Sequence, residues 1–84
     1  MQIENKVFIV SGGASGLGAA SAELLVSAGA KVMLVDMNAE AVAAQAQRLG
    51  AQSVVADISN EAAAEAAVQA TVAAFGSLNG LINC

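Results

Sequence analysis

The chain has 84 residues, 57% hydrophobic and 12% charged, with no proline, tryptophan, tyrosine or histidine, a composition that excludes disordered and fibrous proteins. Its net charge of -4, with three scattered basic residues against seven acidic ones, offers no basic stripe for binding a nucleic acid. One cysteine and no histidine leave too few ligands for a structural zinc site, and polar residues interrupt the uncharged stretch 66–84, so we expect no membrane span.

Strands and helices are predicted to alternate from the start of the chain. The run KVFIV at 6–10 is continuously apolar, as is typical of a strand buried on both faces. Apolar residues at helical spacing then predict a helix that ends at Gly29, with a buried face made of Leu17, Ala20, Leu24, Leu25 and Ala28. The run KVMLVD at 31–36 predicts a second buried strand.

The second half of the chain repeats this alternation. Asn38 is suited to cap a second helix, which Gly50 would end, with its buried face made of Val42, Ala46 and Leu49. A third strand is predicted at 53–57. Ser59 or Asn60 would cap a third helix, which ends before Gly76 and buries Val68, Val72 and Phe75. The stretch 78–83 predicts a fourth strand.

This order predicts an α/β fold: the amino-terminal half of a Rossmann-type, doubly wound parallel sheet. Right-handed βαβ crossovers place helices on both faces, and the expected strand order is 3-2-1-4. The fourth strand would leave an apolar edge open, which natural domains usually cover. We therefore expect residues 1–84 to be the amino-terminal, nucleotide-binding part of one larger domain.

A glycine-rich stretch, SGGASGLG at 11–18, lies between the first strand and the first helix. Unpaired N–H groups and the positive dipole end of a helix amino terminus bind anions, here the pyrophosphate of a dinucleotide. Gly12 would allow a tight turn, Gly16 a close approach of backbone to the ligand, and Gly18 close packing of helix and strand. Ser11 and Ser15 would add hydroxyl donors. The G-x-x-x-G-x-G spacing departs from G-x-G-x-x-G and from a Walker loop, and an ordinary glycine-rich turn is the alternative.

Acidic residues end the second and third predicted strands. Asp36 would accept hydrogen bonds from the adenosine ribose hydroxyls and repel a 2′-phosphate, which favours NAD over NADP; alternatively it starts the turn into the second helix. Asp57 would bind the adenine amino group while Ile58 covers the ring, or else Asp57 caps the third helix. Cys84, at the end of the fourth strand, would line the cofactor or act as a small apolar filler.

Four stretches together resemble the short-chain dehydrogenases/reductases over the whole length of the chain. They are SGGASGLG, Asp36, ADIS at 56–59 and LINC at 81–84, which is similar to the start of that family's Asn-Asn-Ala-Gly stretch. Within the family, the chain looks most like the type II 3-hydroxyacyl-CoA dehydrogenases. That resemblance implies NAD contacts from Ser15, Leu17, Asp36, Asp57, Ile58 and Cys84. Many members carry an asparagine that supports the central sheet where this chain has Cys84, so the chain departs from the family pattern at this position.

The resemblance implies an NAD-dependent oxidoreductase that moves hydride between nicotinamide and a secondary alcohol or ketone. The substrate would be a small molecule such as a 3-hydroxyacyl-CoA, and the intact protein a cytoplasmic homotetramer. The family's catalytic serine, tyrosine and lysine are not matched in these 84 residues, so the chain alone should be inactive. A dinucleotide-binding module without turnover is the alternative function. A ligand-free, alanine-rich structural fragment is a further one, which the loop glycines and strand-end aspartates argue against.

Overall fold

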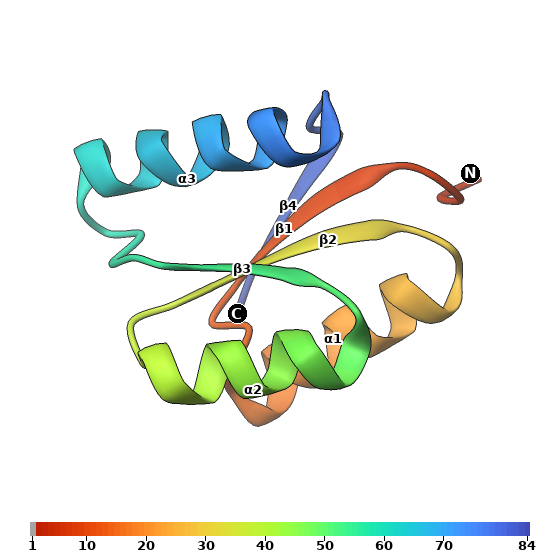
Figure 1. The fold of residues 1–84 in the computed structure, drawn as a ribbon, viewed down its shortest axis with the longest axis horizontal. Coiled ribbons are helices and arrows are strands. Elements are labelled where there is room, and N and C mark those ends of the chain that lie inside the picture. Colours follow the sequence, from red (N-terminus) through yellow and green to blue (C-terminus); the bar gives the residue numbers. More distant parts are fainter. Residues whose placement is uncertain (1) are drawn as a thin grey trace.

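A computed structural model of the chain describes residues 2–84. Four strands and three helices alternate, as predicted: β1 (Val7–Ser11), α1 (Gly16–Ser27), β2 (Lys31–Asp36), α2 (Ala39–Leu49), β3 (Gln52–Val55), α3 (Glu61–Phe75) and β4 (Gly80–Asn83). The strands form one parallel sheet in the order β3-β2-β1-β4, which confirms the predicted fold class and topology. Helices α1 and α2 cover one face of this sheet and α3 covers the other (Figure 1).

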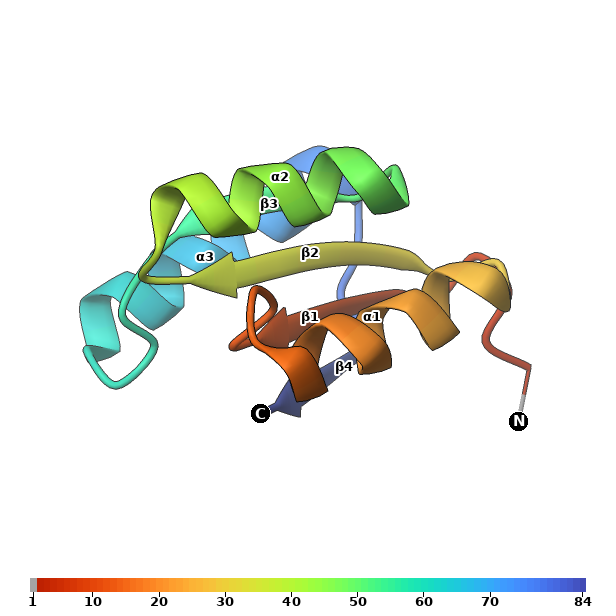
Figure 2. The same cartoon turned by 90° about the horizontal axis from the view of Figure 1, so that it is seen from below.

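The central strands β1 and β2 are buried on both faces, because consecutive side chains point to opposite sides of the sheet. One core cluster lies between the sheet and α1 and α2, which lie side by side in Figure 2, and it contains Val10, Ala22, Val32, Leu34, Val42 and Ala46. The other lies toward α3 and contains Ile9, Met33, Val35 and Ala67. The continuous apolar runs of the sequence therefore fill two separate layers.

The α2 prediction is confirmed in detail. Asn38 is the N-cap and accepts a hydrogen bond from the Ala41 N–H at 3.0 Å, and Gly50 ends the helix in the left-handed conformation. Val42 and Ala46 are buried, and Leu49 packs against their cluster. At α3 the two candidate caps are resolved in favour of Asn60, whose side chain accepts from the Ala63 N–H at 2.9 Å.

The buried faces predicted for α1 and α3 are largely wrong. On α1, Leu17 and Leu24 are 71% and 73% exposed. The predicted positions Ala20 and Ala28 are exposed as well, and only Leu25 is partly buried. On α3, Val68 and Val72 are 39% and 42% exposed, whereas Phe75 packs against the core.

Small residues occupy the faces that α1 and α3 present to the sheet. Gly18 and Ala22 are the buried residues of α1, and Ala67 and Thr71 are those of α3. The residues of each pair are four positions apart. On α1 the buried face begins one position after the predicted Leu17, and on α3 it lies one position before Val68 and Val72, so each face is rotated by about 100° about the helix axis. Small side chains let a helix lie close to the sheet, and the larger apolar residues are thereby turned outward.

Candidate functional site

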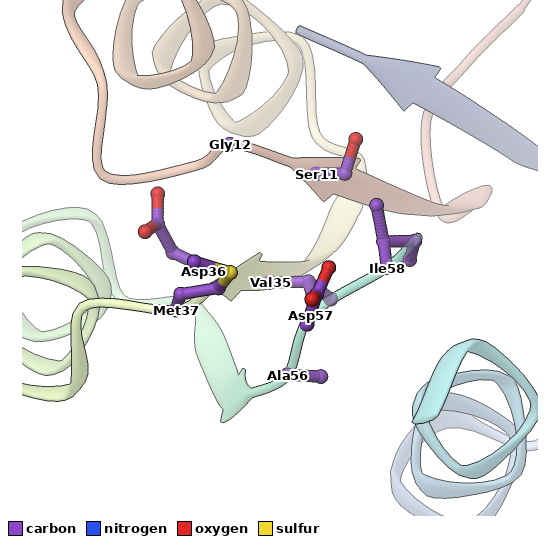
Figure 3. Close-up of a pocket in the computed structure, with 8 residues that line it drawn as sticks. All are labelled: Ser11, Gly12, Val35, Asp36, Met37, Ala56, Asp57 and Ile58. Carbon is purple, nitrogen blue, oxygen red and sulfur yellow. The ribbon is translucent and has the colours of Figure 1, made fainter. Parts of the chain in front are cut away.

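A pocket of about 240 Å³ opens at the carboxyl edge of the sheet. Figure 3 shows its lining, contributed by the ends of β1 and β2 and by the segment after β3: Ser11, Gly12, Val35, Asp36, Met37, Ala56, Asp57 and Ile58. Carboxyl ends of parallel strands are the usual ligand-binding edge of such sheets, at the point where the strand order reverses. Here that point lies between β1 and β4, whereas the pocket lies on the other side of β1, at the ends of β1, β2 and β3.

Gly12 begins the turn that links β1 to α1. Its φ of +69° lies in the left-handed region that favours glycine, which confirms the predicted tight turn. The Ser15 N–H donates to the Gly12 carbonyl at 3.0 Å, and the Gly13 N–H donates to the Val35 carbonyl at 3.1 Å. The loop is therefore closed on itself and also tied to β2.

Ser15 is the N-cap of α1 and lies at the exposed end of the loop. Its hydroxyl accepts from the Gly18 N–H at 3.1 Å and donates to the Gly12 carbonyl at 2.7 Å. The Ser11 hydroxyl donates to the Asn83 carboxamide oxygen at 2.6 Å. Both hydroxyl protons are thus used within the chain, and the expectation that these serines donate to a ligand stays a prediction.

The glycines at 16 and 18 have opposite surroundings. A Cβ at Gly18 would overlap the Gly12 carbonyl. The predicted close packing at Gly18 is therefore present, but its partner is the loop and not, as predicted, a strand. A Cβ at Gly16 would meet no atom within 4 Å. The backbone at Gly16 is therefore open on its outer side, at the amino terminus of α1.

Asp36 ends β2 at the edge of the pocket. One carboxylate oxygen accepts from the Ala14 N–H of the glycine loop and the other from the Asn38 N–H, each at 3.0 Å. The second bond shows that Asp36 does start the turn into α2. The two interpretations of this residue are compatible, because Asp36 also lines the pocket.

Asp57 lies two residues beyond the end of β3, which stops at Val55 because its pairing with β2 ends opposite Asp36. The Asp57 carboxylate accepts hydrogen bonds from the Ser59 hydroxyl at 2.6 Å and from the Ser59 N–H at 3.0 Å. These bonds, the hydroxyl bond most strongly, lower the pKa of the Asp57 carboxyl from its ordinary value of 3.8. The alternative role of Asp57 as the cap of α3 is wrong, since Asn60 caps that helix. Ile58 also lines the pocket and packs against the core below α3.

The predicted ligand-binding residues divide into three groups. Gly12, Asp36, Asp57 and Ile58 line the pocket together. Ser15, Gly16, Leu17 and Gly18 form the N-cap and first turn of α1. Cys84 follows β4, where its N–H donates to the Ser11 carbonyl at 3.2 Å and its own carbonyl lies 2.7 Å from the position of a Cβ on Gly12.

Three pocket residues were missed from the sequence: Val35, Met37 and Ala56. Val35 had been assigned only to the core. Met37 is 67% exposed and follows Asp36 directly, and its place one residue beyond a strand end was the available signal. Ala56 lay inside the strand predicted at 53–57, whereas the observed strand ends one residue before it.

A family model described as short chain dehydrogenase matches residues 6–84. The chain belongs to the short-chain dehydrogenase family. The match includes the glycine loop, Asp36, Asp57 and Cys84, which are the residues that carried the resemblance. The resemblance to this family is therefore confirmed.

Several known members of the short-chain dehydrogenase family are similar to this chain. The 2,5-dichloro-2,5-cyclohexadiene-1,4-diol dehydrogenase of Sphingobium indicum is 42% identical over 83 residues, covering 96% of this chain and 33% of that enzyme. A short chain dehydrogenase/reductase from Burkholderia phymatum in complex with NAD superposes with a TM-score of 0.91 at 35% identity, covering 96% of this chain and 31% of that one. The 3-ketoacyl-(acyl-carrier-protein) reductase from Brucella melitensis complexed with NADH superposes with a TM-score of 0.90 at 38% identity. This match covers 94% of this chain and 34% of that one.

The chain spans about a third of the length of the curated relatives it matches. Within residues 2–84, no helix is both long and apolar enough to cross a membrane. The same described residues contain no group of three or more histidine, cysteine, aspartate or glutamate side chains placed to hold a metal ion.

Proposed function

We propose that this chain binds the adenosine and pyrophosphate portion of NAD for a short-chain dehydrogenase. The observation that carries the proposal is a single pocket lined by both Gly12, at the turn into α1, and the carboxylate of Asp36. A volume of about 240 Å³ falls below the ~300–1,000 Å³ of pockets that enclose a drug-sized ligand, so it suits a nucleoside rather than a whole dinucleotide.

Each part of the site has a role in this proposal. The pyrophosphate would lie at the amino terminus of α1, where the backbone at Gly16 is open and the helix dipole favours an anion. The Asp36 carboxylate would accept hydrogen bonds from the ribose hydroxyls. Asp57 would accept from the adenine amino group, with Ile58 against the ring. Leu17 and Cys84 would complete the contacts from the two sides of the loop.

The residues present fit NAD better than NADP. A carboxylate has about four acceptor positions, and two of those of Asp36 remain after its bonds to Ala14 and Asn38. Among the described residues 2–84, no lysine or arginine lines the pocket, and Arg48 pairs with Glu23 at 2.8 Å on the outer surface of the helices. A 2′-phosphate would therefore meet the Asp36 charge without a cation to offset it.

For the larger protein that we expect to contain this chain, we propose an NAD-dependent oxidoreductase acting on a secondary alcohol or ketone. NAD supplies the chemistry by accepting or donating a hydride at its nicotinamide. The resemblance to type II 3-hydroxyacyl-CoA dehydrogenases favours a 3-hydroxyacyl-CoA as substrate, and it also favours a cytoplasmic homotetramer. The named relatives, which include a cyclic diol dehydrogenase and a 3-ketoacyl reductase, support an alcohol or carbonyl group as the reacting centre.

Calorimetric titration of the chain with NAD and NADP tests the binding proposal. We expect NAD to bind about tenfold to a hundredfold more tightly than NADP. Placing the uncompensated charge of the 2′-phosphate beside the Asp36 carboxylate should cost roughly 1–3 kcal/mol of binding free energy. Asp36→Ala should narrow this gap, whereas the control Glu40→Ala, an exposed carboxylate in the first turn of α2, should preserve it. Comparable affinity of the parent chain for both cofactors would contradict the proposal.

Assay of the larger protein with a secondary alcohol and NAD then separates the two function classes. Turnover supports an oxidoreductase. Tight NAD binding without turnover of hydroxyacyl-CoA, cyclic diol or simple secondary alcohol substrates would favour a dinucleotide-binding module instead.

A further inference from the structure

We propose that Asp36 is a positioning residue for the glycine loop, and that its carboxylate holds the loop in its ligand-binding shape before any ligand arrives. This role is additional to the ribose contact under Proposed function. Its consequence for cofactor choice rests on that proposed function, but the loop-holding role itself does not.

The carboxylate of Asp36 connects two segments that are distant in the sequence. One oxygen accepts from the Ala14 N–H at 3.0 Å in a partly buried bond that spans 22 residues. The other oxygen accepts from the Asn38 N–H, also at 3.0 Å, at the start of α2. Hydrogen bonds to a charged acceptor are stronger than those between neutral groups, so these two bonds fix the orientation of the carboxylate.

The glycine loop depends on this bond because it has few other attachments to β2. The Gly13 N–H donates to the Val35 carbonyl at 3.1 Å, and the next N–H along the chain, that of Ala14, donates to Asp36. The last two residues of β2 therefore receive two successive N–H groups of the loop. Without the carboxylate, the Ala14 N–H would lose its partner next to the pocket, and one bond from Gly13 would remain.

The same arrangement makes asparagine a poor substitute at position 36. A carboxamide has one acceptor oxygen and an NH2 group that only donates, so it can satisfy the Ala14 N–H or the Asn38 N–H but not both. The same geometry would strengthen the proposed preference for NAD over NADP. A carboxylate held from two sides cannot rotate away from a 2′-phosphate, so the repulsion would not be relieved by a side-chain movement.

Amide exchange and NMR on the isotopically labelled chain test the loop-holding role. In the parent chain we expect a through-hydrogen-bond coupling between the Ala14 amide nitrogen and the Asp36 carboxyl carbon. In Asp36→Ala the Ala14 amide should exchange with solvent about ten- to a hundredfold faster, and its proton resonance should move upfield. Asp57→Ala is the matched control, because it removes a carboxylate of the same sheet edge whose only hydrogen-bond partner among the described residues is Ser59.

The outcomes separate this proposal from the proposed function. If Asp36→Ala keeps its β1 and β2 amides protected and Ala14 exchanges as in the parent, the proposal is overturned. If that variant does not fold, the coupling in the parent chain decides, and its absence overturns the proposal. In Asp36→Asn, either the Ala14 N–H or the Asn38 N–H should lose its hydrogen bond to position 36. Retention of both hydrogen bonds would contradict the proposal. Failure of NAD to shift the Ala14 resonance would count against the cofactor proposal alone.

Discussion

At the scale of single residues, the glycine loop contains two glycines that serve different ends. Gly18 is required by the fold, since a side chain there would overlap the Gly12 carbonyl. Gly16 faces open space and is not required by any contact within the described residues. A glycine that the fold does not need, at the amino terminus of a helix, suggests that something outside the chain approaches it.

Substituting each glycine by alanine should separate stability from binding. Gly18→Ala is expected to lower the free energy of unfolding by about 1–3 kcal/mol, because it overpacks the loop. Gly16→Ala should stay within about 0.5 kcal/mol of the parent, because its Cβ meets nothing. Urea unfolding measures both, and NAD titration should show weaker binding by the otherwise stable Gly16→Ala chain. Equal destabilisation by the two substitutions would contradict the geometry.

A second prediction concerns Asp57 and pH. Its pKa is lowered by Ser59, so the contact contributes stability above about pH 3.8 and loses it as the pH falls through the lowered value. Ser59→Ala should move the pKa of the Asp57 carboxyl up toward its ordinary value. Carbon-detected NMR titration measures this pKa. The control Ser53→Ala removes a hydroxyl from β3 and should leave the pKa of Asp57 unchanged, whereas an equal change in both variants would refute the assigned cause.

At the scale of elements, the fully buried residues of α1 and α3 are small, while Leu25 and Phe75 pack only partly against the core. Ala22 is fully buried, while Leu24, two positions on, is 73% exposed. A helix that presents alanine to the sheet comes close to it, and Gly18 lets the amino end of α1 lie against the glycine loop. The placement of the candidate pyrophosphate site therefore depends on small side chains in the middle of α1.

This arrangement predicts unequal effects of substitution along α1. Ala22→Leu is expected to lower the free energy of unfolding by about 1–3 kcal/mol, since no space is left beside the sheet. Leu24→Ala should change it by less than about 0.5 kcal/mol, because its side chain is mostly in water. Thermal or urea unfolding of the two variants measures both. A large loss for Leu24→Ala with little for Ala22→Leu would restore the helix face first predicted from the sequence.

At the scale of the whole molecule, β4 is an edge of the sheet and is unequally covered. Ile82 packs against the cluster below α1 and α2, while Leu81 pairs in register with the buried Ile9 yet is 57% exposed. Paired residues of parallel strands point to the same face, so Leu81 lies on the face of α3 but is not covered by that helix. An exposed, apolar edge strand is a template for pairing with another chain.

We expect the 84-residue chain studied alone to self-associate through β4 and to show no dehydrogenase turnover. Leu81→Lys should reduce association, because a charge on an edge strand opposes pairing. Leu24→Lys is the control, since it places the same charge at an exposed leucine on a helix. Sedimentation velocity over a range of concentrations measures the difference. A chain that stays monomeric at high concentration, or equal effects of the two lysines, would exclude the β4 edge as the cause.

The sequence by itself determined the order of elements, the parallel topology and the location of the loop and strand-end acids. These features depend on local rules: apolar runs specify buried strands, Asn38 caps a helix, and a right-handed crossover leaves few arrangements of four strands. The candidate site could be predicted for the same reason, since carboxyl ends of parallel strands meet at one edge whatever the details of packing.

Only the tertiary structure decided which helix faces are buried and what each polar group contacts. Counting large apolar residues cannot reveal that Ala22 and Ala67 face the sheet, because the distance between helix and sheet is set by both partners together. Nor could it show that the Ser11 and Ser15 hydroxyls bond within the chain, or that Asp36 holds Ala14. Hydrogen bonds between residues far apart in sequence depend on distances that exist only once the layers have packed.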